Sequence, residues 1–243
     1  MHSADTPDQT LRIYYLSEEA VTIEFGQVID LHLLDRVSVL NMLLHQQPFA
    51  GFCTAVPAYA TLTVFFDPLS VSRSDLPGKT CFEKVSGFLQ NSNRLTKGEV
   101  HNAGNVITIP VCYDKNLGPD LEEVARLHKL SIEEVIHLHS AAVYKAYMIG
   151  FVPGFAYLGG MDDQLTTPRK ATPRKAVPAG SVGIAGAQTG VYPMQTPGGW
   201  QIIGRTPVKL FDAGRSQPSL LQAGDQVIFK PVNRAEFNEL VGE

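Results

Sequence analysis

Two kinds of apolar spacing alternate along the N-terminal part of the chain. β-Branched and aromatic residues alternate with polar ones over residues 12–16 and 20–25, which predicts two strands joined by a short turn. Residues 31–44 then carry apolar side chains at helical spacing after Asp30, a residue type that caps helix N-termini. Two further strands and a second helix are expected at residues 50–57, 60–66 and 81–89. Strand pairs that alternate with helices predict an α+β sandwich, in which helices cover one face of an antiparallel sheet.

A polar stretch without apolar periodicity, residues 91–105, divides the chain. We expect an N-terminal α+β domain at residues 1–92, a linker at 93–105 and a β-rich domain at 106–243. The elements expected in the second domain are a strand at 106–112, a helix from Gly118-Pro119-Asp120 to about residue 129, a helix with a Ser131/Glu134 capping box to about residue 139, a strand at 226–231 and a helix from about residue 234.

Residues 150–207 have an unusual composition. They hold eleven of the chain's 21 glycines and seven of its 16 prolines, together with the only tryptophan. Short apolar runs such as residues 182–185 and 201–203 separate the turn residues, whereas a flexible linker would be polar and monotonous. This pattern predicts a compact β-rich module whose turns shape a surface.

Charge and hydropathy exclude several classes of function. The 243 residues are 44% hydrophobic and 18% charged, with a net charge of -4, so the chain has no general electrostatic reason to bind nucleic acid or an anionic membrane. No apolar run is long enough to cross a bilayer and the first residues do not resemble a signal peptide, so we expect a cytoplasmic protein. Cys53, Cys81 and Cys112 are far apart, which predicts reduced packing residues and no metal site.

Several short motifs follow one another in the Gly/Pro-rich segment. They are residues 150–158 (GFVPGFAYL), 167–169 (TPR), 172–174 (TPR), 177–182 (VPAGSV), 188–193 (QTGVYP) and 196–207 (TPGGWQIIGRTP). In this order they resemble the bacterial family of 5-oxoprolinase B subunits, also known as allophanate hydrolase subunit 1 or KipI-like proteins. These proteins are relatives of one half of the carboxyltransferase module of urea carboxylase. Residues 14–16, 21–26, 56–59 and 65–68 are similar to the first domain of the same family.

The resemblance implies a fold and an activity. It implies that the second domain is a cyclophilin-like β-barrel, and that the chain is the B subunit of an ATP-dependent 5-oxoprolinase that opens 5-oxo-L-proline to L-glutamate together with the A and C subunits. ATP would be shared with the partner subunits, without bound metal or biotin. Two alternatives stay open: a KipI-like inhibitor of a sensor histidine kinase, and a urea-carboxylase-like or allophanate-hydrolase-like subunit. The chain has no Met-Lys-Met biotin-attachment motif, which favours the first interpretation.

Four cations within seven residues form the strongest electrostatic feature: Arg169, Lys170, Arg174 and Lys175. Prolines beside each pair fix the local backbone, and arginine binds planar carboxylates and phosphates through two hydrogen bonds. The alternative is a solvated basic loop, but the resemblance favours a catalytic role for Arg169 and Arg174. His139, just before the β-rich segment, is a further candidate acid, base or anion contact, and the alternative is a core histidine.

The same motifs supply candidate ligand-binding residues. Glycine turns let the backbone approach a ligand, and polar groups in an apolar region can orient a small molecule. Simple turns and buried strand ends are the competing explanation, and Trp200 is expected to lie in the core. The candidates for substrate or ATP binding are Tyr157, Gln188, Thr189, Tyr192, Gly198, Gly199 and Arg205. They form no complete ATP site, which predicts that a partner completes the active site and that the isolated chain is inactive.

Overall fold

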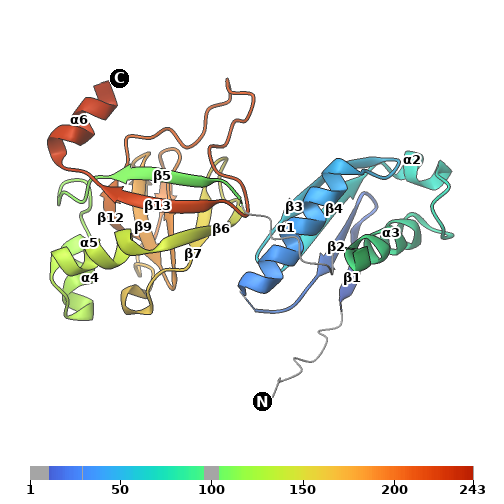
Figure 1. The fold of residues 1–243 in the computed structure, drawn as a ribbon, viewed down its shortest axis with the longest axis horizontal. Coiled ribbons are helices and arrows are strands. Elements are labelled where there is room, and N and C mark those ends of the chain that lie inside the picture. Colours follow the sequence, from blue (N-terminus) through green and yellow to red (C-terminus); the bar gives the residue numbers. More distant parts are fainter. Residues whose placement is uncertain (1–10, 29, 96–103, 243) are drawn as a thin grey trace, which may run out of the picture. The chain divides into compact units, whose positions relative to one another are not determined.

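The computed structural model describes residues 11–28, 30–95 and 104–242. Contacts within the chain divide it into two compact units, Met1–Asn102 and Ala103–Glu243. Both contain helices and strands, and the second is the richer in strands, as the sequence predicts (Figure 1). Residues 96–103 of the expected linker lie outside the described residues, so the linker stays a prediction. Helix α3 continues to Leu95, three residues into that segment.

The first unit is a four-stranded antiparallel sheet with helices against it. Its strand order is β1-β2-β4-β3, and α1 and α3 pack on these strands (Figure 1). The apolar residues that alternate along β2 and β4 form the core with one face of α1. The elements are β1 (Arg12–Ser17), β2 (Ala20–Glu24), α1 (Leu31–Gln46), β3 (Phe52–Pro57), β4 (Thr61–Phe66), α2 (Pro68–Arg73) and α3 (Cys81–Leu95).

Local capping explains where two of these helices begin. The Asp30 carboxylate accepts hydrogen bonds from the backbone N–H groups of His32 and Leu33, at 2.9 and 3.2 Å, so the predicted cap of α1 is confirmed. Helix α2 was not predicted. It begins at Pro68, directly after Asp67, whose side chain accepts from Ser70 N at 2.9 Å.

The second unit is built on a curled seven-stranded sheet of order β12-β9-β10-β7-β6-β13-β5. Strands β13 and β5 run parallel, whereas the other neighbouring strands of this sheet are antiparallel. The elements are β5 (Val106–Val111), α4 (Leu121–His128), α5 (Ile132–Ala141), β6 (Val143–Ile149), β7 (Ala156–Gly159), the 3-10 helix η1 (Asp163–Leu165), β8 (Arg174–Val177), β9 (Ser181–Ala185), β10 (Gln188–Val191), β11 (Thr196–Gly198), β12 (Gln201–Arg205), β13 (Gln226–Pro231) and α6 (Arg234–Gly242).

The two edges of this sheet meet at one point. Cys112, directly after β5, and Arg205, at the end of β12, exchange two backbone hydrogen bonds of 2.9 Å. The sheet is therefore curled far enough for its first and last strands to touch, and its inner face holds the larger core cluster. The finer assignment as a cyclophilin-like barrel stays a prediction.

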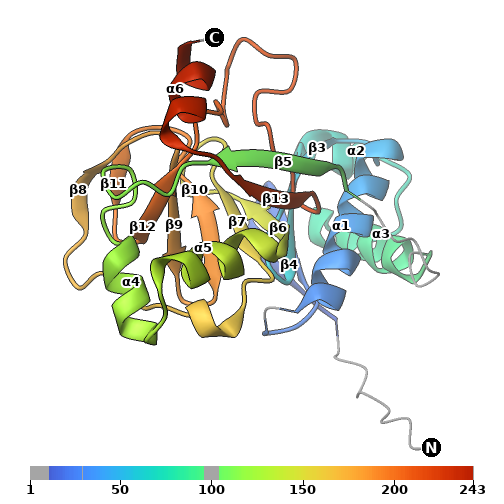
Figure 2. The ribbon, with the colours of Figure 1, turned by 60° about the vertical axis from the view of Figure 1, so that its left-hand side comes forward.

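Helices α4 and α5 pack together against this sheet, α4 on β12 and α5 on β13 (Figure 2). The predicted capping box of α5 is confirmed, because Ser131 N donates to Glu134 Oε2 at 2.7 Å and Glu134 N donates to Ser131 Oγ at 3.1 Å. Helix α4 ends at His128, and Lys129, its C-cap, adopts the left-handed conformation.

A separate two-stranded ribbon, β8 with β11, carries part of the basic cluster (Figure 2). Arg174 on β8 pairs with Gly198 on β11, and Val177 pairs with Thr196. The loop before β8 is joined to the main sheet region, since Lys170 N donates to Gly199 O at 2.7 Å. The ribbon thus fixes Arg174 beside the start of β12.

The three cysteines are free, but they differ in burial. Cys112 is buried and Cys81 is half-buried, as expected for packing residues. Cys53 is exposed on β3, so the prediction of a packing role is wrong for Cys53.

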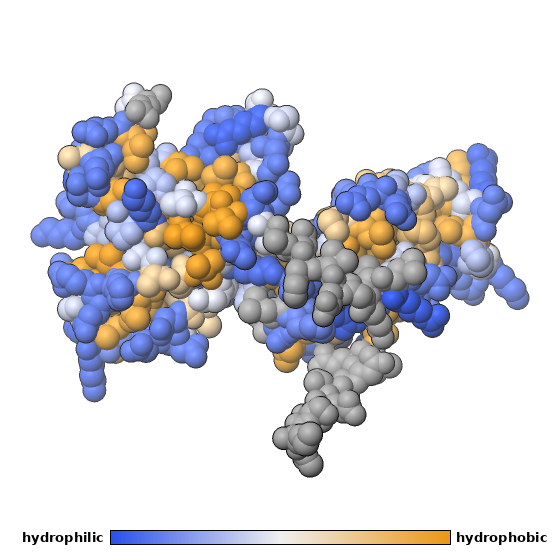
Figure 3. Space-filling model, viewed as in Figure 1, coloured by the Kyte–Doolittle hydropathy of each residue, from blue (hydrophilic) through white to orange (hydrophobic). Residues whose placement is uncertain are grey.

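In the view of Figure 3, apolar residues gather over β5 and β13, where Val106 is exposed. None of the helices in the described ranges is long and apolar enough to span a membrane.

Candidate functional site

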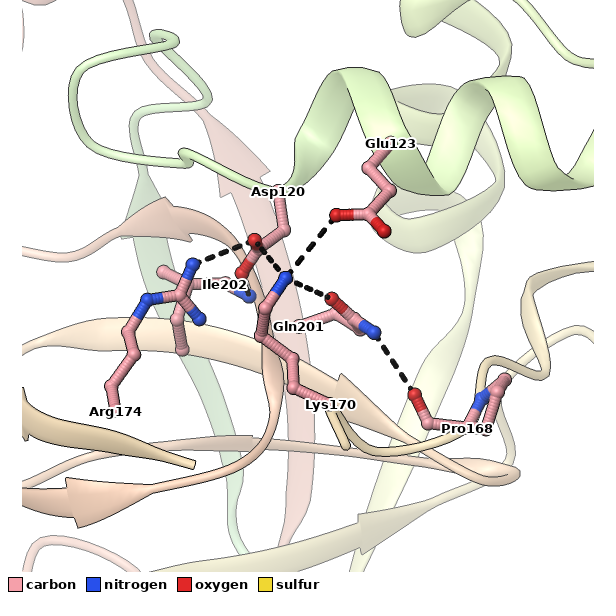
Figure 4. Close-up of polar contacts among 7 residues, drawn as sticks. All are labelled: Asp120, Glu123, Pro168, Lys170, Arg174, Gln201 and Ile202. Carbon is pink, nitrogen blue, oxygen red and sulfur yellow. Dashed lines mark hydrogen bonds and ion pairs between the residues drawn. The ribbon is translucent and has the colours of Figure 1, made fainter. Parts of the chain in front are cut away.

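The carboxylate of Asp120 is the centre of a polar cluster between α4, β12 and the basic loop (Figure 4). Its Oδ1 accepts from Arg174 Nη2 at 2.6 Å and from Lys170 Nζ at 2.9 Å. Its Oδ2 accepts from the backbone N–H of Ile202 at 2.6 Å. Lys170 also reaches Glu123 at 3.2 Å. Asp120 precedes α4 but its side chain does not cap the helix, because it is used by these partners.

These contacts fix the charge state of Asp120. Burial alone would raise its pKa, but the hydrogen bonds from Arg174, Lys170 and Ile202 N outweigh burial and hold the pKa below its ordinary value. The hydrogen bond to Asp120 in turn raises the pKa of Lys170. The cluster is therefore ionised at neutral pH, with one buried carboxylate between two cations.

Gln201 joins the cluster to the loop before β8. Its Nε2 donates to the carbonyl of Pro168 at 3.0 Å, and its Oε1 accepts from Lys170 Nζ at 3.4 Å (Figure 4). Residues 168–170 are thus fastened to β12 at two points. Position 169 lies between them, so the backbone that carries Arg169 is held in place.

The structure separates the four predicted cations into two pairs. Lys170 and Arg174 form internal ion pairs, so the prediction of four cations on a common anion-binding frame is wrong for Lys170. Arg169 and Lys175 are exposed. Arg174 retains one unused group, because its Nη1 is buried and has no hydrogen-bond partner among the described residues. Arg169 therefore keeps donors that an anionic ligand can use, whereas Nη1 of Arg174 is shielded from solvent. The catalytic role of both arginines stays a prediction.

An aromatic cluster lies beside these arginines. Phe155, Tyr192 and Trp200 are buried against one another, with ring centroids 5.3 Å apart for the Phe155–Tyr192 and Phe155–Trp200 pairs. Tyr157 is half-buried and packs edge-on against Phe155 at 4.9 Å. Trp200 is 5% exposed, as expected for a core residue. The rings form an apolar wall, and Tyr157 and Tyr192 contribute hydroxyl groups to it.

The hydroxyl of Tyr192 connects this wall to the cations. Burial raises its pKa, whereas a hydrogen bond with the Trp200 backbone and the charges of Arg169 and Arg174 act in the opposite direction. Both arginines are thus close enough to Tyr192 for their positive charges to lower the pKa of its hydroxyl. Of the predicted site residues, the structure brings together Arg169, Arg174, Tyr157, Tyr192 and Gly198.

The two glycines that were predicted to bind a ligand differ in the space available around them. A Cβ on Gly198 would overlap the Tyr192 hydroxyl, so Tyr192 requires a glycine there. A Cβ on Gly199 would meet Pro173 only at ordinary contact distance, 3.6 Å. The physical role of Gly198 is therefore to admit Tyr192, and its role toward a ligand stays a prediction, as does that of Gly199.

His139 and Thr189 lie in the core, away from these groups. His139 is 0% exposed, and Thr189 Oγ1 donates to the carbonyl of Gly183 at 3.0 Å. Since the hydroxyl proton is used there, His139 Nε2–H donates to Thr189 Oγ1 at 2.9 Å, and Nδ1 accepts from the Tyr113 hydroxyl at 2.8 Å. Burial lowers the pKa of His139 to about 3. Both nitrogens of this neutral imidazole are engaged, so the arrangement favours the core alternative over an acid, base or anion contact.

Gln188 and Arg205 occupy different surroundings from the aromatic wall. Gln188 is half-buried at the start of β10, opposite Ala185. Arg205 Nε donates to the carbonyl of Ala179 at 2.8 Å. Arg205 borders two cavities, one of about 90 Å³ that it shares with Arg174 and one of about 310 Å³ toward α6. The smaller cavity gives the two arginines a common space.

Within the described ranges, no group of three or more His, Cys, Asp or Glu side chains is placed to hold a metal ion. The chain offers cationic donors and aromatic walls. Such a site can bind and orient an anion.

Sequence reasoning identified the arginines but not their anchor. Asp120 was recognised only as a helix start, and Gln201 only as part of a motif. The only signal was that Asp120, after Gly118-Pro119, is a residue type that caps helix N-termini. Local pattern cannot show that the two segments, 54 residues apart, meet.

The family model for the carboxyltransferase domain, subdomain C and D, matches residues 11–221. The chain belongs to this family. A Bacillus subtilis protein, named as the B subunit of 5-oxoprolinase, is 42% identical over 228 residues, which cover 93% of this chain and 95% of that protein. One of the same name from Escherichia coli O157:H7 is 41% identical, covering 92% of this chain and 97% of the relative. The predicted family is confirmed.

Solved structures show the same fold, in chains of similar length and in longer ones. The crystal structure of TTHA0988 matches with a TM-score of 0.75 and 36% identity over 88% of this chain, but this chain spans only 40% of the length of that one. A conserved protein from Pyrococcus horikoshii, PH0987, matches over its whole length with 41% identity and a TM-score of 0.54. The Kluyveromyces lactis urea amidolyase, at 16% identity and a TM-score of 0.74, shares the fold alone.

Proposed function

We propose that this chain is the B subunit of an ATP-dependent 5-oxoprolinase, which opens 5-oxo-L-proline to L-glutamate in the cytoplasm with the A and C subunits. The observation that carries the proposal is the match along 95% of a relative that bears the name of this subunit. We propose that this chain contributes to the enzyme in the same way as that relative.

The proposed reaction requires cationic groups around a phosphoryl group and a carboxylate, and the site supplies some of them. An unactivated lactam carbonyl resists hydrolysis, and transfer of the ATP γ-phosphoryl group to the lactam oxygen makes a leaving group. Water then adds to the carbon, the C–N bond breaks and the ring nitrogen takes a proton, which leaves an acyl phosphate on the opened chain. A second water hydrolyses this acyl phosphate to the carboxylate of glutamate and free phosphate. Cationic donors stabilise the transferring phosphoryl group and the substrate carboxylate. Arg169 supplies such donors, and the unused Nη1 of Arg174 supplies another once the groups that bury it move aside.

Asp120 has a positioning role in this proposal. It holds Arg174 Nη2 at 2.6 Å, so the direction of the guanidinium is fixed. Tyr157 and Tyr192 form the wall against which a small ring can lie. This preorganisation lowers the entropy that is lost when an anion binds.

The same geometry supports the need for partners. Lys170 and Arg174 are already paired with Asp120, and ATP carries more negative charge than the remaining donors can match. We propose that ATP is shared with the partner subunits, and that the isolated chain does not hydrolyse ATP or open 5-oxoproline.

We also assign the second unit to the cyclophilin-like barrels. This assignment is supported by its curled sheet and by the bridge between Cys112 and Arg205.

Growth on 5-oxoproline as the nitrogen source tests the function. A bacterial strain that lacks only the B subunit of its own 5-oxoprolinase should regain growth when this chain is expressed, and an empty vector should not restore it. Growth on ammonium controls for general fitness. Failure of the folded, expressed chain to restore growth, when the strain's own gene does, argues against the assignment.

A further inference from the structure

Phe151 has an unusual backbone conformation. Lys129 and Phe151 are the two non-glycine residues with positive φ in the described parts of the chain, and Lys129 ends a helix, where such a conformation is common. Phe151, with φ 70°, is the middle residue of a three-residue turn in which Val152 N donates to Gly150 O at 2.9 Å. A γ-turn with positive φ is rare and strained, and for a bulky residue this region is a genuine outlier.

The surrounding turn holds Phe151 in this conformation. Gly150 N donates to the carbonyl of Phe155 at 3.0 Å, and Phe155 N donates to the carbonyl of Val152 at 3.1 Å. Phe155 is 2% exposed in the aromatic cluster, so the base of the turn is anchored in the core. Strain of this kind persists only where the rest of the structure determines it, and it gathers at functional sites.

The side chain gains little from the fold. The Phe151 ring is 60% exposed and makes an edge-on contact with Phe155 at 5.6 Å. A glycine would adopt the same φ without strain, and a polar residue would suit the exposed position better. Neither the backbone nor the packing within the described chain therefore explains a phenylalanine at the tip of this turn.

We propose that Phe151 is an aromatic anchor that inserts into an apolar pocket of a partner subunit of the enzyme. This inference rests on the proposed function. A rigid turn that presents one exposed aromatic ring loses little entropy on binding, and buried aromatic anchors dominate the energetics of protein interfaces.

The comparisons favour a protein as the occupant. The matching part of TTHA0988 is 40% of a longer chain, so in that protein this fold is continuous with a further segment. The turn is also adjacent to the candidate site, because Phe155 contacts both the Phe151 and the Tyr157 rings. A subunit that docks on Phe151 would lie beside the tyrosines and Arg169, where the chain lacks the groups to complete an ATP site.

Phe151→Gly separates strain from binding. The substitution relieves the backbone, so the isolated variant should melt at the wild-type temperature or above it. Its affinity for the purified A and C subunits, measured by calorimetry, should fall at least 10-fold. Phe151→Leu keeps an apolar side chain and should lose less affinity than Phe151→Gly. Leu127→Ala removes another exposed apolar side chain, on α4, and should bind as the wild type does.

Each other outcome has a distinct meaning. Wild-type affinity of Phe151→Gly would overturn the anchor while leaving the proposed function intact. Normal affinity with a raised KM for 5-oxoproline would make Phe151 a substrate contact, and would also overturn it. If the wild-type chain binds neither partner, both the anchor and the proposed function fail. If Phe151→Gly does not fold, Phe151→Ala must show the loss of affinity in a folded chain, and wild-type affinity there overturns the anchor.

Discussion

The carboxylate of Asp120 accepts a hydrogen bond of 2.6 Å from Arg174, a residue 54 positions away in the sequence. This pair joins the start of α4 to the β8–β11 ribbon. Because Asp120 is buried and also holds Lys170, it determines both the position of the ribbon and the direction in which Arg174 points. Its removal should therefore affect stability and site geometry together.

Asp120→Ala should lower the free energy of unfolding by roughly 3 kcal/mol, because it leaves two cations without their shared partner. Urea denaturation of the isolated chain measures this change. Asp212→Asn is the matched control, since Asp212 lies in exposed ion pairs with Lys209 and Arg215, and it should show no measurable change. Equal effects of the two substitutions would contradict the anchoring role of Asp120.

Arg169 and Arg174 should give different results when each is replaced by alanine. Arg169 is exposed, so Arg169→Ala should lower kcat/KM of the complete enzyme by roughly 100-fold while the melting temperature stays unchanged. Arg174→Ala should lower both kcat/KM and the melting temperature, because it also breaks the ion pair with Asp120. Activity and thermal unfolding are to be measured on the same preparations. Full activity of Arg169→Ala would remove Arg169 from the site.

The buried His139 should make the chain sensitive to acid. Its pKa of about 3 in the folded chain lies below the ordinary value of 6.5, so the unfolded chain binds the proton more tightly. Through this pKa difference His139 contributes about 5 kcal/mol to the free energy of unfolding above pH 6.5. This contribution is lost as the pH falls toward 3.

His139→Gln tests this assignment. The variant should be less stable than the wild type at pH 7, and the difference should shrink as the pH falls, since glutamine does not titrate. The free energy of unfolding, measured at several pH values, reports the difference. A gap of constant size from pH 7 to pH 3 would show that His139 does not contribute to the pH dependence.

Gly198→Ala should destabilise the chain by about 1–3 kcal/mol, because the new Cβ would overlap the Tyr192 hydroxyl. Gly87→Ala is a useful counterpart. Gly87 lies inside α3 with no atom near the added Cβ, so alanine there should stabilise by about 0.5–1 kcal/mol. Urea denaturation distinguishes the two directions. A neutral Gly198→Ala would show that Tyr192 can move without loss.

Sequence reasoning predicted the features that local chemistry determines. The Asp30 cap and the Ser131/Glu134 box depend on residues two or three positions apart, and both are confirmed. The strands were predicted from alternation over five or six residues. Helix α2 was missed because its six residues have no apolar periodicity, although Asp67-Pro68 marks its start.

The candidate site could be predicted only in part, because distant contacts decide the role of each side chain. Arg169 and Lys170 are neighbours of equal charge, yet one is exposed and the other is paired with Asp120. His139 looked available for chemistry, but its contacts with Tyr113 and Thr189 come from segments 26 and 50 residues away. The resemblance to a known family, in contrast, depends on the motifs themselves and was confirmed by the comparisons.

The central claim is that this chain is a required subunit of a 5-oxoprolinase and is inactive alone. The most direct measurement is the amount of ADP and glutamate formed from ATP and 5-oxoproline by this chain, by the A and C subunits, and by all three. We predict that only the complete mixture forms both products, in equal amounts. Substrate-dependent turnover by this chain alone, or full turnover by the A and C subunits without it, would contradict the claim.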